Sequence, residues 1–150
     1  MNEPRYWDDY EIGQKFALGS VSFTEEEIVS FGRQFDPQPF HVDPTAAKAS
    51  MYGSLIASGW HVAAKMMRLF VDNYVDRRTA LGSPGLDELR WLKPVRPGDT
   101  LSGWVVCAGK VPSKSRPTMG IIHEHWEVTN QKGELVMTTK GINMVQRRPA

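Results

Sequence analysis

Residues 55–75 read LIASGWHVAAKMMRLFVDNYV, and this stretch holds the longest helical pattern in the chain of 150 residues. Apolar side chains recur in it at intervals of three and four positions, which places them on one face of an α-helix. The residues that form this stripe are Val62, Met66, Leu69 and Phe70. Ionisable side chains interrupt the stretch on its other faces, so it is unsuited to cross a membrane. We expect a long helix that packs on a core.

The second half of the chain is typical of β-structure, because alternating apolar and polar residues are separated by turns rich in Gly and Pro. We predict strands over residues 87–95, 100–111, 118–129 and 134–146, and a shorter strand over residues 16–23. Strands joined by short turns pair antiparallel. The pattern therefore indicates a curved antiparallel sheet beside the long helix, which is the α+β class.

Two shorter helices are predicted between the first strand and the long helix. Thr24 and Glu27 have the spacing of a capping box, which starts a helix that runs to about residue 34. Asp43 followed by Pro44 starts a second helical turn, with Asp43 as its N-cap.

Length and composition favour one domain, residues 1–150, since 41% of the side chains are hydrophobic. The net charge of +1 offers no basic surface for nucleic acid or for an anionic membrane. Cys107 is the single cysteine, which excludes an internal disulfide and favours a reducing compartment. Residues 1–10 are polar and acidic and lack the apolar segment of a secretory signal. We therefore expect a cytoplasmic protein.

One segment carries side chains placed for proton transfer: residues 35–43, FDPQPFHVD. Asp36 and His41 lie on a loop that two prolines stiffen, since each ring fixes its own φ and biases the preceding residue toward an extended backbone. A rigid loop with a carboxylate and an imidazole suits general base chemistry on a small polar molecule. Structural roles are the alternative: Asp36 would cap a turn, and His41 would lie half-buried against a backbone partner.

The start of the long helix offers a second functional feature, at Ser58 and Gly59. Ser58 is a candidate cap, and Gly59 presents a backbone N–H with no Cβ in the way. Unpaired N–H groups and the positive end of the helix dipole favour negative charge on oxygen, which is what an oxyanion hole requires. The alternative is a glycine that serves the turn alone.

Other reaction classes find little support. His123 and His125 would share one face of a strand, as two metal ligands do, but no third ligand stands at a suitable spacing, so we expect no metal site. Ser58 lies outside any Gly-x-Ser-x-Gly elbow of a serine hydrolase. The sequence contains no Gly-rich loop of the kind that binds phosphate or a dinucleotide.

Residues 35–44, FDPQPFHVDP, resemble the signature of the MaoC-like, (R)-specific enoyl-CoA hydratases, which is roughly Gly-Asp-x-Asn-Pro-hydrophobic-His-x-Asp. Three further segments resemble parts of the same family. They are residues 56–60 at the start of the long helix, the turn 93–101 (KPVRPGDTL) and the hairpin 130–134 (NQKGE). The resemblance spans about residues 8–146.

The resemblance implies a hotdog fold, in which a curved antiparallel sheet wraps around a long central helix. It also implies that Asp36 and His41 orient and deprotonate a water that adds to a 2-enoyl-CoA thioester, while the Gly59 N–H holds the thioester oxygen. The supporting residues around them would be Gln38, Phe40, Ser58 and Trp60. No metal or redox cofactor is expected, and the implied partners are the acyl-CoA substrate and a second copy of the chain, in a homodimer or a higher homo-oligomer.

Three positions depart from the family pattern. Gln38 stands where Asn is usual, Ser58 where His commonly precedes the glycine, and Phe35 where a small residue precedes the Asp. Gln38 keeps the amide with one more methylene, so we expect it to hold the loop from a shifted position. Phe35 would narrow the approach to the site. These changes bear on the identity of the substrate more than on the reaction.

Two other functions remain open. A hotdog thioesterase would share the fold and usually carries a carboxylate on the central helix, whereas the first acid here is Asp72, late in the helix. A non-catalytic acyl-CoA-binding module would keep the fold without base chemistry, which the presence of both Asp36 and His41 disfavours. For the acyl-CoA that the resemblance implies, basic residues such as Arg96, Lys114 and Arg116 could meet the CoA phosphates; the alternative is that each lies on a solvated face.

Overall fold

The apolar stripe becomes helix α4, Gly59–Asn73, in the computed structural model, which describes residues 2–150. Val62, Met66 and Phe70 are buried in the core, and Leu69 is partly buried beside it. Ser58 stands at the N-cap, but its hydroxyl makes no capping hydrogen bond, so the predicted cap is wrong. No helix within residues 2–150 is both long and apolar enough to cross a membrane.

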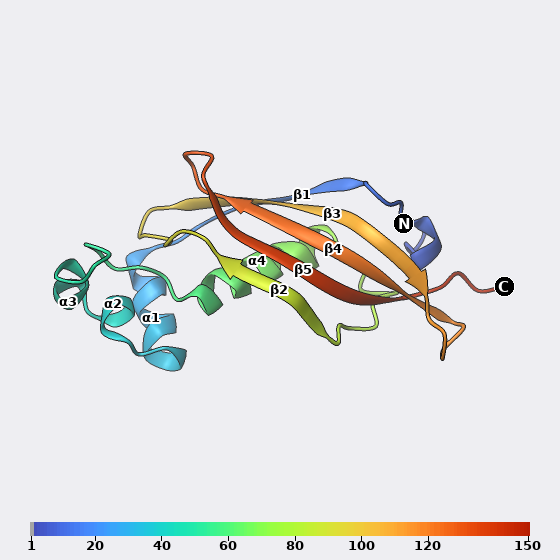
Figure 1. Ribbon diagram of the computed structural model, residues 1–150, viewed down its shortest axis with the longest axis horizontal. Coiled ribbons are helices and arrows are strands. Elements are labelled where there is room, and N and C mark those ends of the chain that lie inside the picture. Colours follow the sequence, from blue (N-terminus) through green and yellow to red (C-terminus); the bar gives the residue numbers. More distant parts are fainter. Residues whose placement is uncertain (1) are drawn as a thin grey trace.

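Five antiparallel strands form one sheet that curves around α4 (Figure 1). Their order in the sheet is β1-β3-β4-β5-β2. Pairing of β3 with β4 and of β4 with β5 follows the prediction from short turns. The bounds are Lys15–Ser22 for β1, Gly85–Trp91 for β2, Thr100–Pro112 for β3, Met119–Thr129 for β4 and Leu135–Gln146 for β5.

The prediction that β2 pairs with β3 is wrong, because β2 pairs with β5 at the edge of the sheet. β2 ends at Trp91, well before residue 95, and Pro94 has no N–H to donate to a neighbouring strand. The segment 92–99 instead crosses the end of the sheet next to the start of α4, where the Ala57 N–H donates to the Val95 carbonyl over 2.8 Å. The short connection is therefore a crossover and not a hairpin.

The core lies between α4 and the concave face of the sheet. Its fully buried apolar side chains include Leu18, Leu101, Val105, Ile122, Val128 and Met137. Along β4 the inward positions alternate as in any half-buried strand. One of them is Glu124, which is only 1% exposed. The expected helix wrapped by a sheet, the hotdog arrangement of the α+β class, is confirmed.

Three short helices cover one end of the sheet, beside the start of α4 (Figure 1). They are α1 (Glu25–Phe35), α2 (Pro39–Val42) and α3 (Pro44–Lys48). Thr24 caps α1 by accepting from the Glu27 N–H over 3.1 Å, but the Glu27 carboxylate pairs with Lys65 on α4 and completes no capping box. Asp43 caps α3 by accepting from two N–H groups, as predicted.

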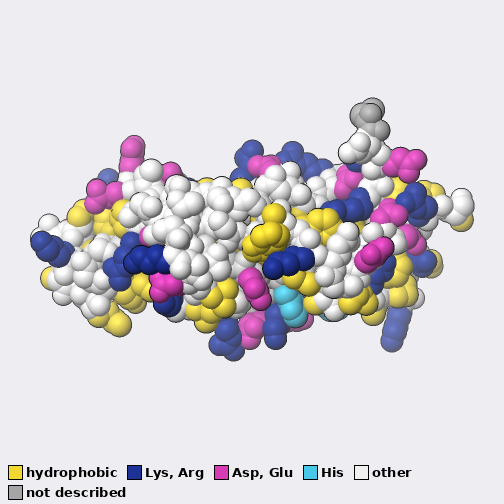
Figure 2. Space-filling view, turned by 90° about the horizontal axis from the view of Figure 1, so that it is seen from above, with side chains coloured by type: hydrophobic (Ala, Val, Ile, Leu, Met, Phe, Trp, Pro, Cys, Tyr) yellow, Lys and Arg dark blue, Asp and Glu magenta, His cyan; other side chains and the backbone are white. Residues whose placement is uncertain are grey.

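Both termini lie at the opposite end of the sheet from α1–α3 (Figure 1). The N-terminal arm contains a 3-10 turn, η1 (Trp7–Asp9), and the Trp7 indole donates to the Ile121 carbonyl of β4 over 3.0 Å. Figure 2 shows acidic and basic side chains interspersed on the face it presents, without a large area of one sign. Residues 35–43 run from the last residue of α1 to the cap of α3, so they lie at the end of the sheet opposite to the termini (Figure 1).

Candidate active site

Asp36 is held by its neighbours at the end of α1. Its N–H donates to the Gly32 carbonyl over 2.9 Å, and its side-chain Oδ1 accepts from the Gln38 amide over 2.7 Å. Its other oxygen, Oδ2, lies 3.2 Å from Nε2 of His41. Gln38 therefore orients the carboxylate, as expected for an amide that holds this loop.

His41 comes from α2, the single helical turn that Pro39 begins. Its side chain is buried, and its Nδ1 lies 2.7 Å from the Ile56 carbonyl. A carbonyl oxygen only accepts, so Nδ1 carries a proton. Nε2 lies 3.2 Å from Asp36 Oδ2. A protonated ring donates from Nε2 directly to this oxygen, whereas in a neutral ring both atoms accept hydrogen bonds, so that one water can donate to both.

The pKa of Asp36 lies below its ordinary value. Burial raises it, but Gln38, the Ser58 hydroxyl and the His41 ring together stabilise the charged form and prevail. Ser58 Oγ is buried and has no well-aligned hydrogen-bond partner among residues 2–150. It lowers the pKa of Asp36 because the hydroxyl lies close to the carboxylate. Asp36 is therefore a carboxylate at neutral pH.

A cavity of about 360 Å³ opens between α2, the start of α4 and the crossover after β2. His41 and Gly59 both line it, whereas Asp36 does not and reaches it only through its contact with His41. Gly59 has no left-handed backbone that would require glycine. A Cβ there would instead stand 2.4 Å from a ring atom of Trp91. Glycine is needed because Trp91 packs directly on this backbone, and the turn alone does not explain it.

The remaining predicted residues divide into two groups. Gln38 and Phe40 line the cavity, and Ser58 is buried behind it. Trp60 does not line it, since its side chain is 61% exposed and packs edge-on against Trp91. Phe35 is 70% exposed and does not contribute to the cavity wall, so the predicted narrowing of the approach is not found.

Trp91 is a lining residue that sequence reasoning missed. Its place in a predicted strand was clear, but its position over Gly59 depends on β2 lying at the sheet edge next to α4. The short connection to β3 concealed this arrangement. The one available signal in the sequence was Gly59 itself, because a glycine allows another side chain to pack directly on the backbone, as Trp91 does here.

The basic residues expected to meet the CoA phosphates either lie far from the cavity or already bond to other groups of the protein. Arg96 donates to the Tyr52 carbonyl and to Ser54 Oγ, which fixes the loop before α4. Lys114 and Arg116 lie in the β3–β4 connection, at the far end of the sheet from the cavity (Figure 1). Lys93 is the basic residue that lines the cavity, and it pairs with Glu134. Among residues 2–150 no three His, Cys, Asp or Glu side chains cluster as metal ligands would.

Gly32 on α1 positions this pair through the backbone of α2. A Cβ at Gly32 would stand 3.0 Å from the His41 carbonyl oxygen and 2.9 Å from a methyl carbon of Val42. We expect Gly32→Ala to push α2 away and to lower kcat by about tenfold or more, because small misplacements of catalytic groups are costly. For the enoyl-CoA hydration that the sequence analysis expects, steady-state kinetics checks this, with KM largely retained. Ser30→Ala, at an exposed position of the same helix, is the matched control, and equal kinetics in both variants would contradict the expectation.

A model of the MaoC-like domain family matches residues 9–129. The chain belongs to the MaoC-like family. A MaoC-like dehydratase from Rhodospirillum rubrum superposes with a TM-score of 0.89 at 38% identity, covering 97% of this chain and 99% of that one.

Two curated relatives extend the comparison. An (R)-specific enoyl-CoA hydratase from Rhodospirillum rubrum is 31% identical over 114 residues, which cover 73% of this MaoC-like chain and 74% of the relative. The uncharacterized protein YdeM from Bacillus subtilis is 29% identical over 125 residues, 83% of this chain and 87% of its own length. The family contains hydratases and dehydratases, so the site is best considered for the addition and removal of water.

Proposed function

We propose that this MaoC-like protein is an (R)-specific hydratase of 2-enoyl-CoA thioesters, or a 3-hydroxyacyl-CoA dehydratase in the reverse direction. The observation that carries the proposal is the contact of Asp36 Oδ2 with His41 Nε2 over 3.2 Å, next to a cavity that His41 and Gly59 both line. The relative named as an (R)-specific enoyl-CoA hydratase supports the same reaction class.

The proposed mechanism begins with a water that donates to Asp36 and His41. As its oxygen bonds to the β-carbon, one O–H bond breaks and the pair takes up the proton. Electrons move through the double bond to the thioester oxygen, and the enolate charge is stabilised by the Gly59 N–H at the start of α4. A preorganised donor of this kind is worth about 3 to 4 kcal/mol of barrier. The pair then returns a proton to the α-carbon.

We also propose that this reaction runs without a metal or redox cofactor, in the cytoplasm. Water addition to an enoyl thioester transfers protons and no net electrons, so the residues above suffice. Cys107 is buried and free, which suits a reducing compartment. Retention of activity after dialysis against a chelator checks the first point, and cell fractionation checks the second.

A homodimer is the proposed assembly. β2 is an edge strand with one side unpaired, and exposed apolar side chains gather on it and on the neighbouring face of α4. They are Trp60, Met67, Leu86, Trp91 and Leu92. Burial of this surface by a second copy would stabilise a dimer. Sedimentation equilibrium at micromolar concentration tests this, and a monomer would contradict it.

The thioesterase alternative is weakened by the surroundings of Asp72. This first acid of α4 is paired with Arg68 and Arg77 near the end of the helix, away from the Gly59 cavity. The non-catalytic alternative is weakened by the intact contacts of Asp36 and His41.

Crotonyl-CoA distinguishes the three functions. For the hydratase we expect loss of the ultraviolet absorbance of the conjugated double bond and release of no free thiol. Thiol release with a saturated acyl-CoA would indicate a thioesterase. No change in either assay, with binding of crotonyl-CoA intact, would indicate a binding module.

A further inference from the structure

The loop before α4, residues 52–57, contacts one part of the candidate active site and leads into the other. The Ile56 carbonyl lies 2.7 Å from Nδ1 of His41, and the Ile56 N–H donates to the Phe40 carbonyl over 3.1 Å. Gly59, the first residue of α4, follows three positions after Ile56. A displacement of this loop would therefore move the imidazole and the first amide of α4 together.

The crossover after β2 holds this loop from the other side. The Ala57 N–H donates to the Val95 carbonyl over 2.8 Å. The side chain of Arg96 donates from Nη1 to the Tyr52 carbonyl over 2.6 Å and to Ser54 Oγ over 2.5 Å. One guanidinium thus fixes two positions of the loop.

Arg96 is itself anchored in a tight turn. Its N–H donates to Asp99 Oδ2 over 2.9 Å, and the Asp99 N–H donates back to the Arg96 carbonyl over 3.0 Å. The preceding residue, Val95, is only 3% exposed, and the Arg96 side chain is half-buried. The guanidinium therefore extends from a backbone that is held in place on its own account.

The charge of Arg96 has no acidic partner. Within residues 2–150 no carboxylate lies within ion-pair distance of its guanidinium. Its two acceptors in the loop are neutral oxygens. Hydrogen bonds from a charged donor are stronger than those between neutral groups, and a guanidinium loses less freedom per bond than an ammonium. These properties suit a side chain whose task is to hold a loop.

We infer that Arg96 is a positioning residue for the proposed hydratase reaction. It fixes residues 52–57, and through them the Ile56 carbonyl that orients His41 and the start of α4 at Gly59. Its effect on turnover rests on the proposed function, whereas its effect on the contact between His41 and Ile56 can be measured without turnover. This role replaces the expectation that Arg96 meets the CoA phosphates.

Kinetics with two thioesters distinguish these two roles. Arg96→Met is expected to lower kcat for crotonyl-CoA hydration by about tenfold with KM largely retained, because small displacements of catalytic groups are costly. We expect the same loss in kcat/KM with the N-acetylcysteamine thioester of crotonate, which has the reacting group but no phosphate. Arg116→Met, at an exposed position of the β3–β4 connection, is the matched control and should match the wild type. A loss confined to KM for crotonyl-CoA would mean that Arg96 binds phosphate, and would overturn the inference.

A second variant covers the case in which Arg96→Met does not fold, which urea unfolding determines. Ser54→Ala removes one of the two acceptors in the loop and leaves the guanidinium in place. We expect a smaller loss of kcat, by about threefold, with both thioesters. Wild-type kinetics in each variant that folds would overturn the inference.

Hydrogen exchange at His41 tests the inference without turnover. NMR follows the exchange of the His41 Nδ1 proton with solvent, and His41→Ala identifies its resonance. Because the Ile56 carbonyl protects this proton, we expect exchange to be at least about tenfold faster in Arg96→Met and unchanged in Arg116→Met. If the wild type hydrates neither thioester, the hydratase proposal fails and the exchange rates alone decide the role of Arg96. Equal exchange in Arg96→Met and the wild type would overturn it.

Discussion

Replacement of Asp36 by Asn is expected to lower kcat for crotonyl-CoA hydration by about two orders of magnitude or more, with the fold retained. The amide keeps the shape of the side chain but removes the negative acceptor that faces His41 Nε2 over 3.2 Å. In the proposed mechanism the attacking water then has one base in place of two. Initial rates from ultraviolet absorbance measure the effect, and circular dichroism and the unfolding temperature check the fold.

His41→Ala should cause a loss of similar size, because the imidazole is the other acceptor for the same water. Asp43→Ser is the matched control on this segment, since Ser keeps the cap of α3 and Asp43 takes no part in the proposed reaction. Near-normal rates in Asp36→Asn or His41→Ala, or an equal loss in Asp43→Ser, would contradict the assignment of Asp36 and His41 as the catalytic pair.

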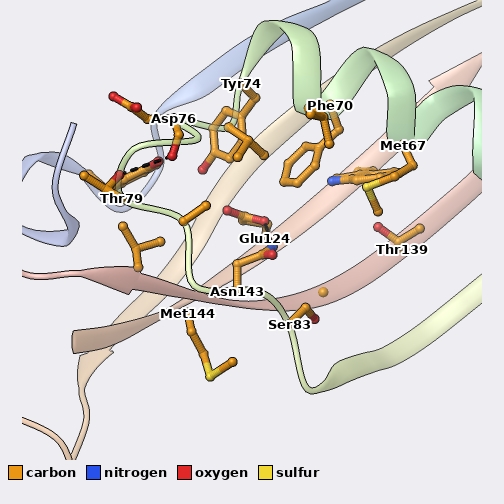
Figure 3. Close-up of a pocket in the computed structure, with 18 of the residues that line it drawn as sticks. Met67, Phe70, Tyr74, Asp76, Thr79, Ser83, Glu124, Thr139, Asn143 and Met144 are labelled. Carbon is orange, nitrogen blue, oxygen red and sulfur yellow. Dashed lines mark hydrogen bonds between the residues drawn. The ribbon is translucent and has the colours of Figure 1, made fainter. Parts of the chain in front are cut away.

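Glu124→Gln should have the largest effect on stability, and the variant should be more stable than the wild type above neutral pH. Burial raises the pKa of Glu124 to about 7 in the fold, above its value in the unfolded chain, against the effects of Tyr74 and Asn143, which lie beside it (Figure 3). Between about pH 4.5 and 7 the native state therefore binds more protons than the unfolded state, and this carboxyl lowers stability as pH rises. A neutral Gln avoids that penalty, which amounts to about 3 kcal/mol above pH 7.

The other titratable and polar groups near Glu124 are the same in the variant and in the wild type, so their contributions to the difference in stability largely cancel. They are Tyr10, Tyr74, Cys107, Asn143 and Arg5. Urea unfolding at pH 5 and pH 8 measures the difference between variant and wild type. We expect little difference at pH 5 and a clear gain for Glu124→Gln at pH 8. Glu127→Gln, on the exposed face of the same strand, should show no such trend, and a difference that does not depend on pH would contradict the argument.

Several features of the fold and site could be predicted because their signals are local. The apolar stripe of α4 and the cap at Asp43 both appear where short-range spacing indicates them. The contact between Asp36 and His41 follows from a short stiff segment, so few conformations separate them. The cap at Ser58 was mispredicted because its hydroxyl turns toward Asp36, a tertiary neighbour that helix rules do not consider.

Other features depend on distant parts of the chain. The pairing of β2 with β5 is set by how the whole sheet curves around α4 and not by the loop that follows β2. Trp91 reaches Gly59 only as a result of that pairing. On β4, sequence reasoning considered only His123 and His125, whereas the alternation of Glu124 with Ile122 and Trp126 points Glu124 into the core. The register of alternation was the signal that could have indicated a buried acid.

The most direct test of the account is the double variant Asp36→Asn/His41→Ala, measured for crotonyl-CoA hydration beside each single variant. Two groups that act on one water function as a unit, so removing the second after the first should cost little more. We predict a rate for the double variant close to that of the more impaired single variant. A loss equal to the product of the two single losses would mean that Asp36 and His41 act independently, which would contradict the central claim.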